Sequence, residues 1–203
     1  MSLAIIKYNA GNVQSVLYAL QRLGVNAIVT DKHEDILAAD KVIFPGVGNA
    51  DSAMKYLKGT GLDRLIISLK QPVLGICLGL QLLCNSSEEG DIKCLGIFDA
   101  AVKKFDHASL QVGEPAAFKI PHMGWNTIYG LSSSLMKDVS EESYVYYVHS
   151  YYAELTPQTI ATTDYILPYS AAIQKNNFYG VQFHTEKSAD AGEKILSNFL
   201  KII

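Results

Sequence analysis

The stretch Val73-Leu74-Gly75-Ile76-Cys77-Leu78-Gly79 decides the expected fold, because it reads as a strand that turns directly into a helix. Its first four residues predict a short, buried strand, and the leucines between positions 78 and 83 predict an apolar helix. Cys77 stands at the junction, with a glycine two residues away on each side. This is the spacing of a nucleophile elbow, whose tight turn strains the backbone and leaves room only for glycine-sized neighbours.

The elbow interpretation gives Cys77 a chemical role. The turn would lift its sulfur out of the sheet, beside the N-terminus of the following helix. There the unpaired amides and the helix dipole favour thiolate over thiol. The alternative is a structural cysteine buried at the end of a core strand, which is common for free cysteine. The glycine spacing favours the nucleophile.

The first half of the chain alternates strands with helices. Strands are expected at residues 3–8, 26–30, 42–44 and 73–76, and helices at 13–23, 33–39, 50–57 and 62–69. Such alternation predicts a parallel sheet with helices on both faces. Pro45 is expected to end the third strand, followed by a tight turn through Gly48. Because ligands bind at the carboxyl ends of parallel strands, this turn and Cys77 should be neighbours.

The second half changes character. Short strands separated by tight turns are expected at residues 100–105, 143–154, 158–165, 171–175 and 179–183, before a closing helix that starts at Ala189. This pattern is more antiparallel, so the central sheet should be mixed and mostly parallel. Neither a repeat nor a linker interrupts the chain, which predicts a single domain over residues 1–203.

Composition limits the classes of function. With 49% hydrophobic residues the chain can build a large α/β core, and its net charge of -3 gives no electrostatic reason to expect nucleic acid. Its three cysteines form no metal-binding pair and fit a reducing compartment. The first residues lack the pattern of a signal peptide, and no apolar stretch is long enough to span a membrane. We therefore expect a cytoplasmic protein with no membrane partner, metal or cofactor.

A cysteine nucleophile needs a base, and His184 is the best placed of the five histidines. It follows an expected strand, and Glu186 lies two residues beyond it. In an extended segment residues i and i+2 face the same side, so the carboxylate can hold one imidazole nitrogen while the other faces the sulfur. An isolated H-x-E also fits half of the zinc deaminase signature, but no cysteine follows Cys94, which excludes that class.

An oxyanion hole would complete the site. One donor is expected to be the backbone amide of Leu78, the residue after the nucleophile. The second is expected from Gly46-Val47-Gly48, whose glycines leave the backbone free to turn an amide toward the sulfur. The alternative for this segment is an ordinary turn between strand and helix.

Together these residues resemble the class I glutamine amidotransferases, and most closely the family of glutaminase subunits of imidazole glycerol phosphate synthase. The resemblance covers essentially the whole chain. It rests on five runs: Gly75-Ile76-Cys77-Leu78-Gly79-Leu80-Gln81, Gly180-Val181-Gln182-Phe183-His184, Pro45-Gly46-Val47-Gly48, Pro121-His122-Met123-Gly124-Trp125-Asn126 and Val148-His149-Ser150-Tyr151-Tyr152. The run Ser-Glu-Glu-Gly at residues 87–90 also fits. The resemblance implies the three-layer, flavodoxin-like fold of that class.

The resemblance also implies hydrolysis of L-glutamine to glutamate and ammonia through a thioester on Cys77. His184 would act as base and then acid, and Glu186 would orient it. The residues that it implies for holding glutamine are Gly48, Gln81, Glu88, Ser150 and Tyr151. For Gln81 the structural alternative is a polar residue that only caps the core.

Family membership implies a partner. The ammonia would pass to a separate (β/α)8-barrel synthase subunit, which makes imidazole glycerol phosphate and an aminoimidazole carboxamide ribotide in histidine biosynthesis. The residues expected at this heterodimer interface are Asn12, Trp125, Asn126, Tyr144 and Lys187. A lone tryptophan is about as often core as interface.

Two departures from the family pattern concern the site and the docking surface. Thr185 stands between His184 and Glu186, where the family usually has proline, and the loop before Gly11 differs from the common pattern. Two other functions stay open: a glutaminase that serves another synthase or none, and a catalytically idle docking subunit. The intact Cys77, His184 and Glu186 favour an active enzyme over the idle subunit.

Overall fold

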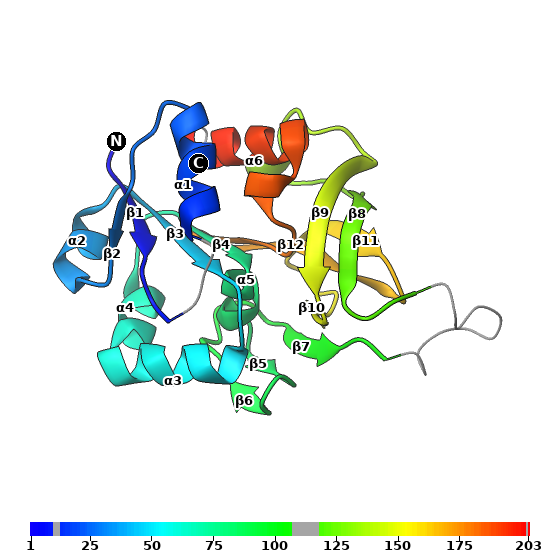
Figure 1. Cartoon of the computed structure of the whole chain (residues 1–203), viewed down its shortest axis with the longest axis horizontal. Helices are drawn as coiled ribbons and strands as arrows, with labels where there is room; N and C mark the ends of the chain where they lie inside the picture. Colours follow the sequence, from blue (N-terminus) through cyan, green and yellow to red (C-terminus); the bar gives the residue numbers. More distant parts are fainter. Residues whose placement is uncertain (10–12, 107–117, 202) are drawn as a thin grey trace.

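The computed structural model describes residues 1–9, 13–106, 118–201 and 203. Its centre is a seven-stranded sheet in the order β11-β12-β13-β4-β3-β1-β2 (Figure 1). The strands are β1 (Leu3–Ile6), β2 (Ile28–Thr30), β3 (Lys41–Gly46), β4 (Val73–Cys77), β11 (Thr159–Asp164), β12 (Pro168–Lys175) and β13 (Phe178–Val181). The first four and β13 are parallel, whereas β12 runs antiparallel to both of its neighbours. The predicted mixed, mostly parallel sheet is confirmed.

Helices cover both faces of this sheet. On one face lie α1 (Val13–Arg22) and α6 (Ala189–Lys201), and on the other lie α3 (Ala50–Thr60), α4 (Leu62–Ser68) and α5 (Leu78–Leu83), with α2 (His33–Ala38) beside β2 (Figure 1). Apolar residues at helical spacing explain this arrangement: Val16 and Leu20 of α1, for example, are buried against the sheet. The expected three layers are therefore present.

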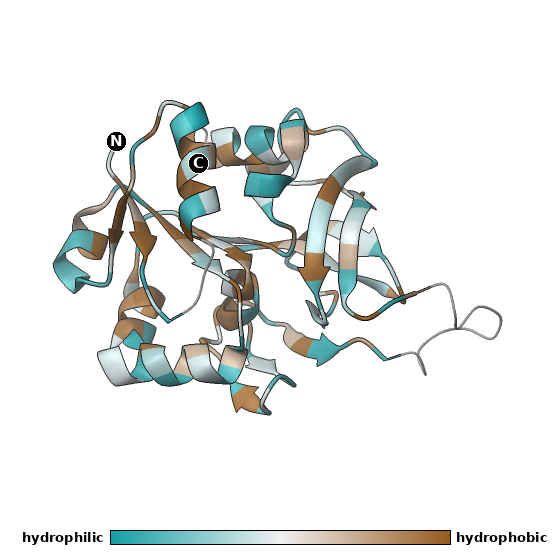
Figure 2. Cartoon of the chain, viewed as in Figure 1, coloured by the Kyte–Doolittle hydropathy of each residue, from teal (hydrophilic) through white to brown (hydrophobic). Residues whose placement is uncertain are grey.

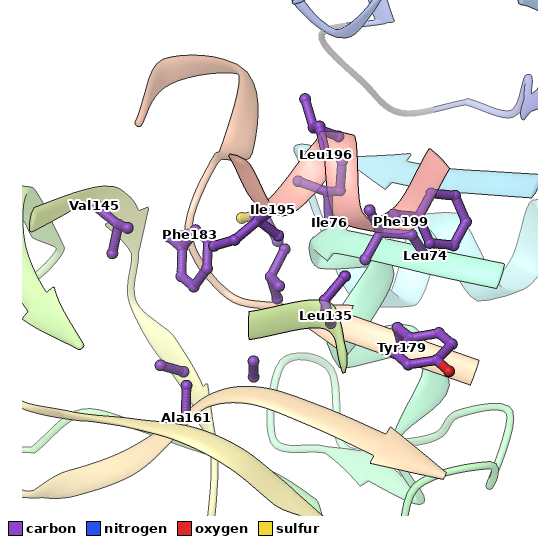
Figure 3. Close-up of a cluster of buried hydrophobic side chains, with 14 of the residues drawn as sticks. Leu74, Ile76, Leu135, Val145, Ala161, Tyr179, Phe183, Ile195, Leu196 and Phe199 are labelled. Carbon is purple, nitrogen blue, oxygen red and sulfur yellow. The ribbon is translucent and has the colours of Figure 1, made fainter. Parts of the chain in front are cut away.

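Each face of the sheet has its own hydrophobic core, because successive strand residues point to opposite faces. In β1, Leu3 and Ile5 belong to the core under α1 and α6, while Ala4 and Ile6 belong to the core over α3, α4 and α5. Figure 3 shows part of the first core, where Phe199 of α6 lies close to Leu74 of β4. The parallel strands are brown in Figure 2, as expected for strands that are buried on both faces.

Two smaller sheets flank the centre. One has the order β10-β7-β5-β6, from Tyr151–Ala153, Ala101–Lys104, Ser86–Ser87 and Ile92–Lys93. The other is an antiparallel ribbon of β8 (His122–Ile128) and β9 (Ser143–His149), in which His122 pairs with His149 and Trp125 with Tyr146. We call this pair of strands the β8–β9 ribbon.

Three sequence expectations need correction. The strand expected at 143–154 is two strands, broken at Ser150, where the chain leaves the ribbon and enters the smaller sheet. No strand was expected at 122–128, because the first part of this strand lacks the usual alternation: the polar His122 is buried, whereas the apolar Met123 and Trp125 are exposed. Pro45 does not end β3, which continues to Gly46 by pairing with β4. Pairing with β1 has already stopped at Ile43, so proline's missing N–H breaks no pair there.

None of the helices in the described part of the chain is long and apolar enough to cross a membrane.

Candidate active site

Cys77 occupies the strained elbow that the sequence predicts. It is the last residue of β4 and directly precedes α5, with φ 54° and ψ −108°. A non-glycine residue with positive φ is uncommon and is held there only by its surroundings. A side chain at Gly79 would collide with the carbonyl oxygen of Phe44 on β3, and one at Gly75 would lie 2.8 Å from the backbone of Gly79. The two glycines are therefore a steric requirement of the turn.

His184 and Glu186 form a buried pair beside this cysteine. His184 Nδ1 lies 2.8 Å from Glu186 Oε1, and each side chain is 2% exposed. Burial opposes a charge on the imidazole, but the adjacent Cys77 thiol and the Glu186 carboxylate outweigh it and raise the pKa of His184 to about 10. Within the described residues His184 Nε2 is buried without a hydrogen bond of good geometry. One imidazole nitrogen is thus held by the carboxylate, and the other is free for chemistry.

The backbone that carries His184 differs from the extended segment that we expected. His184 itself is extended, but Thr185–Lys187 form a short 3-10 helix, η3, closed by the Lys187 N–H that donates to the His184 carbonyl at 3.0 Å. The i, i+2 contact with Glu186 is nevertheless confirmed. A tight turn brings these side chains together as an extended strand would, so the predicted contact was right and its predicted geometry wrong.

Ser188 ties this turn to the β8–β9 ribbon. Its hydroxyl donates to the His184 carbonyl at 2.6 Å and accepts from the Tyr146 N–H at 2.9 Å. The His184 N–H in turn donates to the Tyr146 carbonyl at 2.9 Å. Ser188 is fully buried, so these bonds are shielded from water. The catalytic histidine candidate is therefore positioned by β9 as well as by its own turn.

A cavity of about 480 Å³ opens at Cys77. This volume is typical of sites that hold small molecules. The predicted oxyanion residues Val47, Gly48 and Leu78 line it together with the cysteine. Gly48 has φ 123°, a backbone conformation that favours glycine. Gln81, Ser150 and Tyr151 also line the cavity, so six of the predicted site residues meet in one space around the thiol.

The Gln81 side chain is held by hydrogen bonds across the site. Its Nε2 donates to the Tyr151 carbonyl at 2.8 Å and to Gln182 Oε1 at 3.0 Å, and Gln182 Nε2 lies 3.7 Å from Cys77 Sγ. Gln81 thus links two sides of the cavity, and its amide donors are already occupied. Gln182 was not predicted as a site residue, although it stands in the run that led to His184.

Glu88, which the resemblance implies in the glutamine site, points away from it. Its carboxylate pairs with the Lys103 ammonium at 3.2 Å and accepts from the Lys104 N–H at 2.7 Å, both on β7. The next residue, Glu89, lines the cavity instead, and its carboxylate accepts from the Ala50 N–H at 2.7 Å. Side chains of adjacent residues diverge at the end of β5, so the carboxylate in the site is that of Glu89.

Three of the residues expected at the partner interface form one surface on the outer side of the β8–β9 ribbon. Trp125 is 52% and Tyr144 is 64% exposed. The Trp125 ring packs edge-on against the ring of Tyr146 at 5.9 Å, and Lys187 Nζ lies 5.8 Å from the centre of the same ring. Trp125 is therefore not a core residue. We call Trp125, Tyr144, Tyr146 and Lys187 the aromatic surface.

Asn126 and Asn12 complete the set of expected interface residues. Asn126 is half-buried on the inner side of the ribbon, where its Nδ2 donates to the Asp164 carbonyl at 2.8 Å. Asn12 lies outside the described residues. Within the described ranges no group of three or more histidine, cysteine, aspartate or glutamate side chains is placed to hold a metal ion.

Comparison with known proteins places the chain in a family. The model of the class-I glutamine amidotransferases matches residues 4–203. The chain is 56% identical over 202 residues to the imidazole glycerol phosphate synthase subunit HisH of Bacteroides fragilis strain YCH46, covering all of both chains. It is 44% identical to the HisH subunit of Pasteurella multocida strain Pm70, covering all of this chain and 98% of that one.

Solved structures agree in fold. A putative GMP synthase subunit from Thermoplasma acidophilum superposes with a TM-score of 0.74 at 20% identity, covering all of this chain and 94% of the other. A second structure, described as a glutamine amidotransferase, has the same TM-score at 16% identity and covers 98% of that chain. At such low identities these likenesses support the fold alone.

Proposed function

This chain belongs to the class-I glutamine amidotransferase family, and we propose that it is the glutaminase subunit of an imidazole glycerol phosphate synthase. It hydrolyses L-glutamine to glutamate and ammonia for histidine biosynthesis, with residues 1–203 acting as a single amidotransferase domain. The observation that carries this function is a cysteine in a strained elbow beside a buried His184–Glu186 pair. That site stands in a chain similar over its full length to HisH subunits.

The reaction uses Cys77 as nucleophile. Its thiolate attacks the side-chain amide carbon of glutamine and forms a tetrahedral intermediate. The backbone N–H of Leu78, with one from Val47 or Gly48, stabilises the negative oxygen of this intermediate. The His184 imidazolium gives its proton to the leaving nitrogen, so ammonia departs and a thioester remains. His184 then takes a proton from water, and the hydroxide attacks the thioester. The carbon–sulfur bond breaks, which releases glutamate and one proton to solvent and restores the Cys77 thiolate and the His184 imidazolium. Glu186 keeps the imidazole oriented throughout.

The cavity holds the amino-acid end of glutamine. Its ammonium group needs a carboxylate, and Glu89 supplies the negative charge on the cavity wall. Its carboxylate needs donors, which the backbone around Ser150 and Tyr151 provides at the break between β9 and β10. Gly48 and Gln81 shape the space between these two ends. Glu88 does not take part, because its carboxylate is paired with Lys103 outside the cavity.

The ammonia goes to a synthase subunit. In water at neutral pH it would become ammonium and lose its nucleophilic lone pair, so a protected route to a second active site is required. We infer that the partner is a (β/α)8 barrel that adds the ammonia to a phosphoribulosyl nucleotide. It docks on the aromatic surface beside the catalytic turn. The exposed Trp125 and Tyr144 support this choice, since aromatic residues are enriched at the centres of interfaces.

The test combines the chain with a synthase subunit of a histidine pathway. Imidazole glycerol phosphate formation is measured with glutamine or with ammonia as the nitrogen source, for each isolated subunit and for the pair. We expect glutamine to support synthesis only with the pair, and ammonia to support it with the isolated synthase subunit. Rapid glutamine turnover by the chain, without synthesis in the pair, would mean that it serves another synthase. No turnover in any mixture would mean an idle docking subunit.

A further inference from the structure

A buried group of polar and aromatic side chains fills the space between the aromatic surface and the cavity. We call it the histidine–tyrosine network, and it consists of Asn126, His122, Tyr169, His149 and the Tyr151 carbonyl. The His122 ring stacks on Tyr165 with centroids 3.8 Å apart. Tyr169 is fully buried, and its hydroxyl lies 3.2 Å from His122 Nδ1 and 3.3 Å from His149 Nε2. One hydroxyl thus joins the two imidazoles.

The direction of each hydrogen bond can be derived from the end nearest the cavity. His149 Nδ1 lies 2.8 Å from the Tyr151 carbonyl, and a carbonyl only accepts, so Nδ1 carries the proton. A neutral His149 then has a bare Nε2, which must accept from the Tyr169 hydroxyl. Because that hydroxyl gives its only proton to His149, its oxygen accepts from His122, whose Nδ1 must carry a proton as well.

The far end of the network fits the same assignment independently. Asn126 Oδ1 accepts from the Thr127 N–H at 2.8 Å, which fixes the orientation of the amide, so Nδ2 is the donor. This Nδ2 lies 3.4 Å from His122 Nε2, which carries no proton in a neutral imidazole that is protonated at Nδ1. Two separate constraints therefore agree on one arrangement of donors from Asn126 to the Tyr151 carbonyl.

Both histidines stay neutral in this position. Burial lowers the pKa of His122 to about 4. Burial, together with the adjacent His122, lowers the pKa of His149 to about 3, although its bond to the Tyr151 carbonyl opposes this. Both imidazoles are therefore neutral at pH 7 and available as hydrogen-bonding groups.

The network ends on the wall of the catalytic cavity. The Tyr151 carbonyl accepts from His149 and also from Gln81 Nε2, and Gln81 leads through Gln182 to Cys77. His149, Ser150 and Tyr151 all line the cavity. At the other end, Asn126 follows Trp125 of the aromatic surface along β8. The chain of hydrogen bonds thus runs from Asn126, on the inner side of the ribbon, to the nucleophile.

We propose that Tyr169 is a positioning residue of the glutaminase. Its hydroxyl joins His122 and His149 into one network that holds the Ser150–Tyr151 wall of the glutamine cavity and connects it to the strand under the aromatic surface. This inference rests on the proposed function for its effect on glutamine, but the arrangement of protons can be tested without any turnover. Tyr169 does not touch the reacting atoms, so its loss should weaken glutamine binding more than chemistry.

The kinetic test is Tyr169→Phe in the complex with the synthase subunit. Phenylalanine keeps the ring but leaves His149 Nε2 without a donor, so His149 can move its proton to Nε2 and release the Tyr151 carbonyl. We expect the KM for glutamine to rise about three- to tenfold, as for the loss of one buried hydrogen bond, with kcat changed less than about twofold. Ammonia-dependent synthesis should not change.

Tyr165→Phe is the matched control. The Tyr165 ring also contacts the network, since it stacks on His122, but its hydroxyl donates to the Lys119 carbonyl at 2.7 Å, outside the network. This variant removes a tyrosine hydroxyl without breaking the link between the histidines, so the KM should stay near the wild-type value. Equal increases in KM for both variants, or an unchanged KM for Tyr169→Phe, would overturn the proposal. A wild-type complex that does not turn over glutamine would instead overturn the proposed function.

The protonation of the two histidines can also be measured on the wild-type protein, which does not depend on the folding of any variant. Nuclear magnetic resonance of ¹⁵N-histidine-labelled protein reports which ring nitrogen of each histidine is protonated. We expect His122 and His149 both as neutral Nδ1–H forms at pH 7. Protonation of Nε2 in either histidine would contradict the derived network, whatever the kinetics show.

Discussion

The catalytic cavity has two walls that are built in different ways. On one side the elbow of β4 and α5 holds Cys77 by steric packing, with glycines where any side chain would collide with the backbone. On the other side the β8–β9 ribbon and the chain beyond it hold Ser150 and Tyr151 through hydrogen bonds between polar side chains. Close packing leaves one arrangement, whereas single hydrogen bonds contribute only about 0.5–1.5 kcal/mol each and can be rearranged. We therefore expect the elbow to determine chemistry and the ribbon to determine binding and regulation.

The largest effect is expected on the elbow side. Cys77→Ala should abolish glutamine-dependent synthesis, because removal of a covalent nucleophile typically lowers turnover by a factor on the order of 10⁴–10⁶. Ammonia-dependent synthesis by the partner should be intact, which separates lost chemistry from lost docking. Steady-state rates with the two nitrogen sources check this. Glutamine-dependent activity within about tenfold of the wild-type value would show that Cys77 is not the nucleophile.

The second-largest effect tests whether docking of the synthase subunit on the ribbon side regulates the oxyanion segment beside the elbow. An uncoupled glutaminase would waste glutamine, so we expect the Val47–Gly48 segment to be misaligned in the free chain and corrected by docking. One oxyanion donor is worth roughly 10²–10³ in rate, so the liganded complex should hydrolyse glutamine faster than the isolated chain by that factor. Trp125→Ala should require a higher synthase concentration for the same maximal rate, because a large exposed ring is lost from the contact. Equal rates for the free chain and the liganded complex would contradict coupling.

An intermediate effect is expected from two adjacent glutamates. Glu89→Gln should raise the KM for glutamine about 10- to 100-fold, because a charged hydrogen bond to the substrate ammonium is worth about 1.5–3 kcal/mol. The glutamine side chain introduced at position 89 can still accept the hydrogen bond from the Ala50 N–H, so the N-terminus of α3 keeps this contact. Glu88→Gln is the matched control and should leave the KM near wild type, since Glu88 faces Lys103. The opposite ranking of the two KM values in a glutamine titration would assign the ammonium-binding carboxylate to Glu88 instead.

The elbow and the pair Glu88 and Glu89 show what the sequence can and cannot predict. The elbow was predictable because its requirements are local: glycines two residues from Cys77 and an apolar strand before it. The contact of His184 with Glu186 was predictable because they are two residues apart. The choice between Glu88 and Glu89 depends on how the chain leaves β5, which is set by pairing with β7, a strand more than ten residues away. Composition and residue spacing therefore do not predict which of the two glutamates faces the cavity.

The first strand of the ribbon, β8, was harder to predict because the burial pattern at its start is inverted. In β8 the polar His122 is buried while Met123 and Trp125 are exposed, so hydrophobic alternation does not identify the strand. The burial of His122 is possible only because Tyr169, from a distant strand of the main sheet, satisfies one of its nitrogens. Such a network requires several long-range contacts at once, and none of them is visible until the sheets are assembled.

A smaller effect concerns His184, which lies beside Cys77 on the turn that follows β13. Its pKa is raised to about 10 because the influence of Cys77 and Glu186 outweighs burial. The folded value exceeds the unfolded value of 6.5, so the imidazolium contributes stability that is fully present below about pH 6.5 and lost as pH rises through about 10. Cys77→Ala should lower the titration midpoint of His184 by about one to three pH units. Nuclear magnetic resonance titration checks this, and an unchanged midpoint would mean that Glu186 alone sets the pKa.

The smallest effect is expected at Thr185, which separates the two residues of the catalytic pair. Thr185 is the first residue of η3 and His184 before it is extended, with φ −85° and ψ 101°. Proline suits a first helical position, and the residue before a proline prefers extended geometry. The Thr185 hydroxyl is buried without a partner among the described residues, so its replacement breaks no side-chain hydrogen bond there.

Thr185→Pro should therefore raise the free energy of unfolding by at most about 1 kcal/mol, mainly by restricting the unfolded chain, and change turnover less than tenfold. Denaturant unfolding and glutamine hydrolysis measure the two quantities. Thr185→Ala is the control, because it removes the hydroxyl but keeps the backbone N–H. If proline abolishes turnover and alanine does not, the Thr185 N–H itself supports the catalytic turn. The catalytic turn would then depend on a single hydrogen bond, as the ribbon side depends on hydrogen bonds, rather than on packing, as the elbow does.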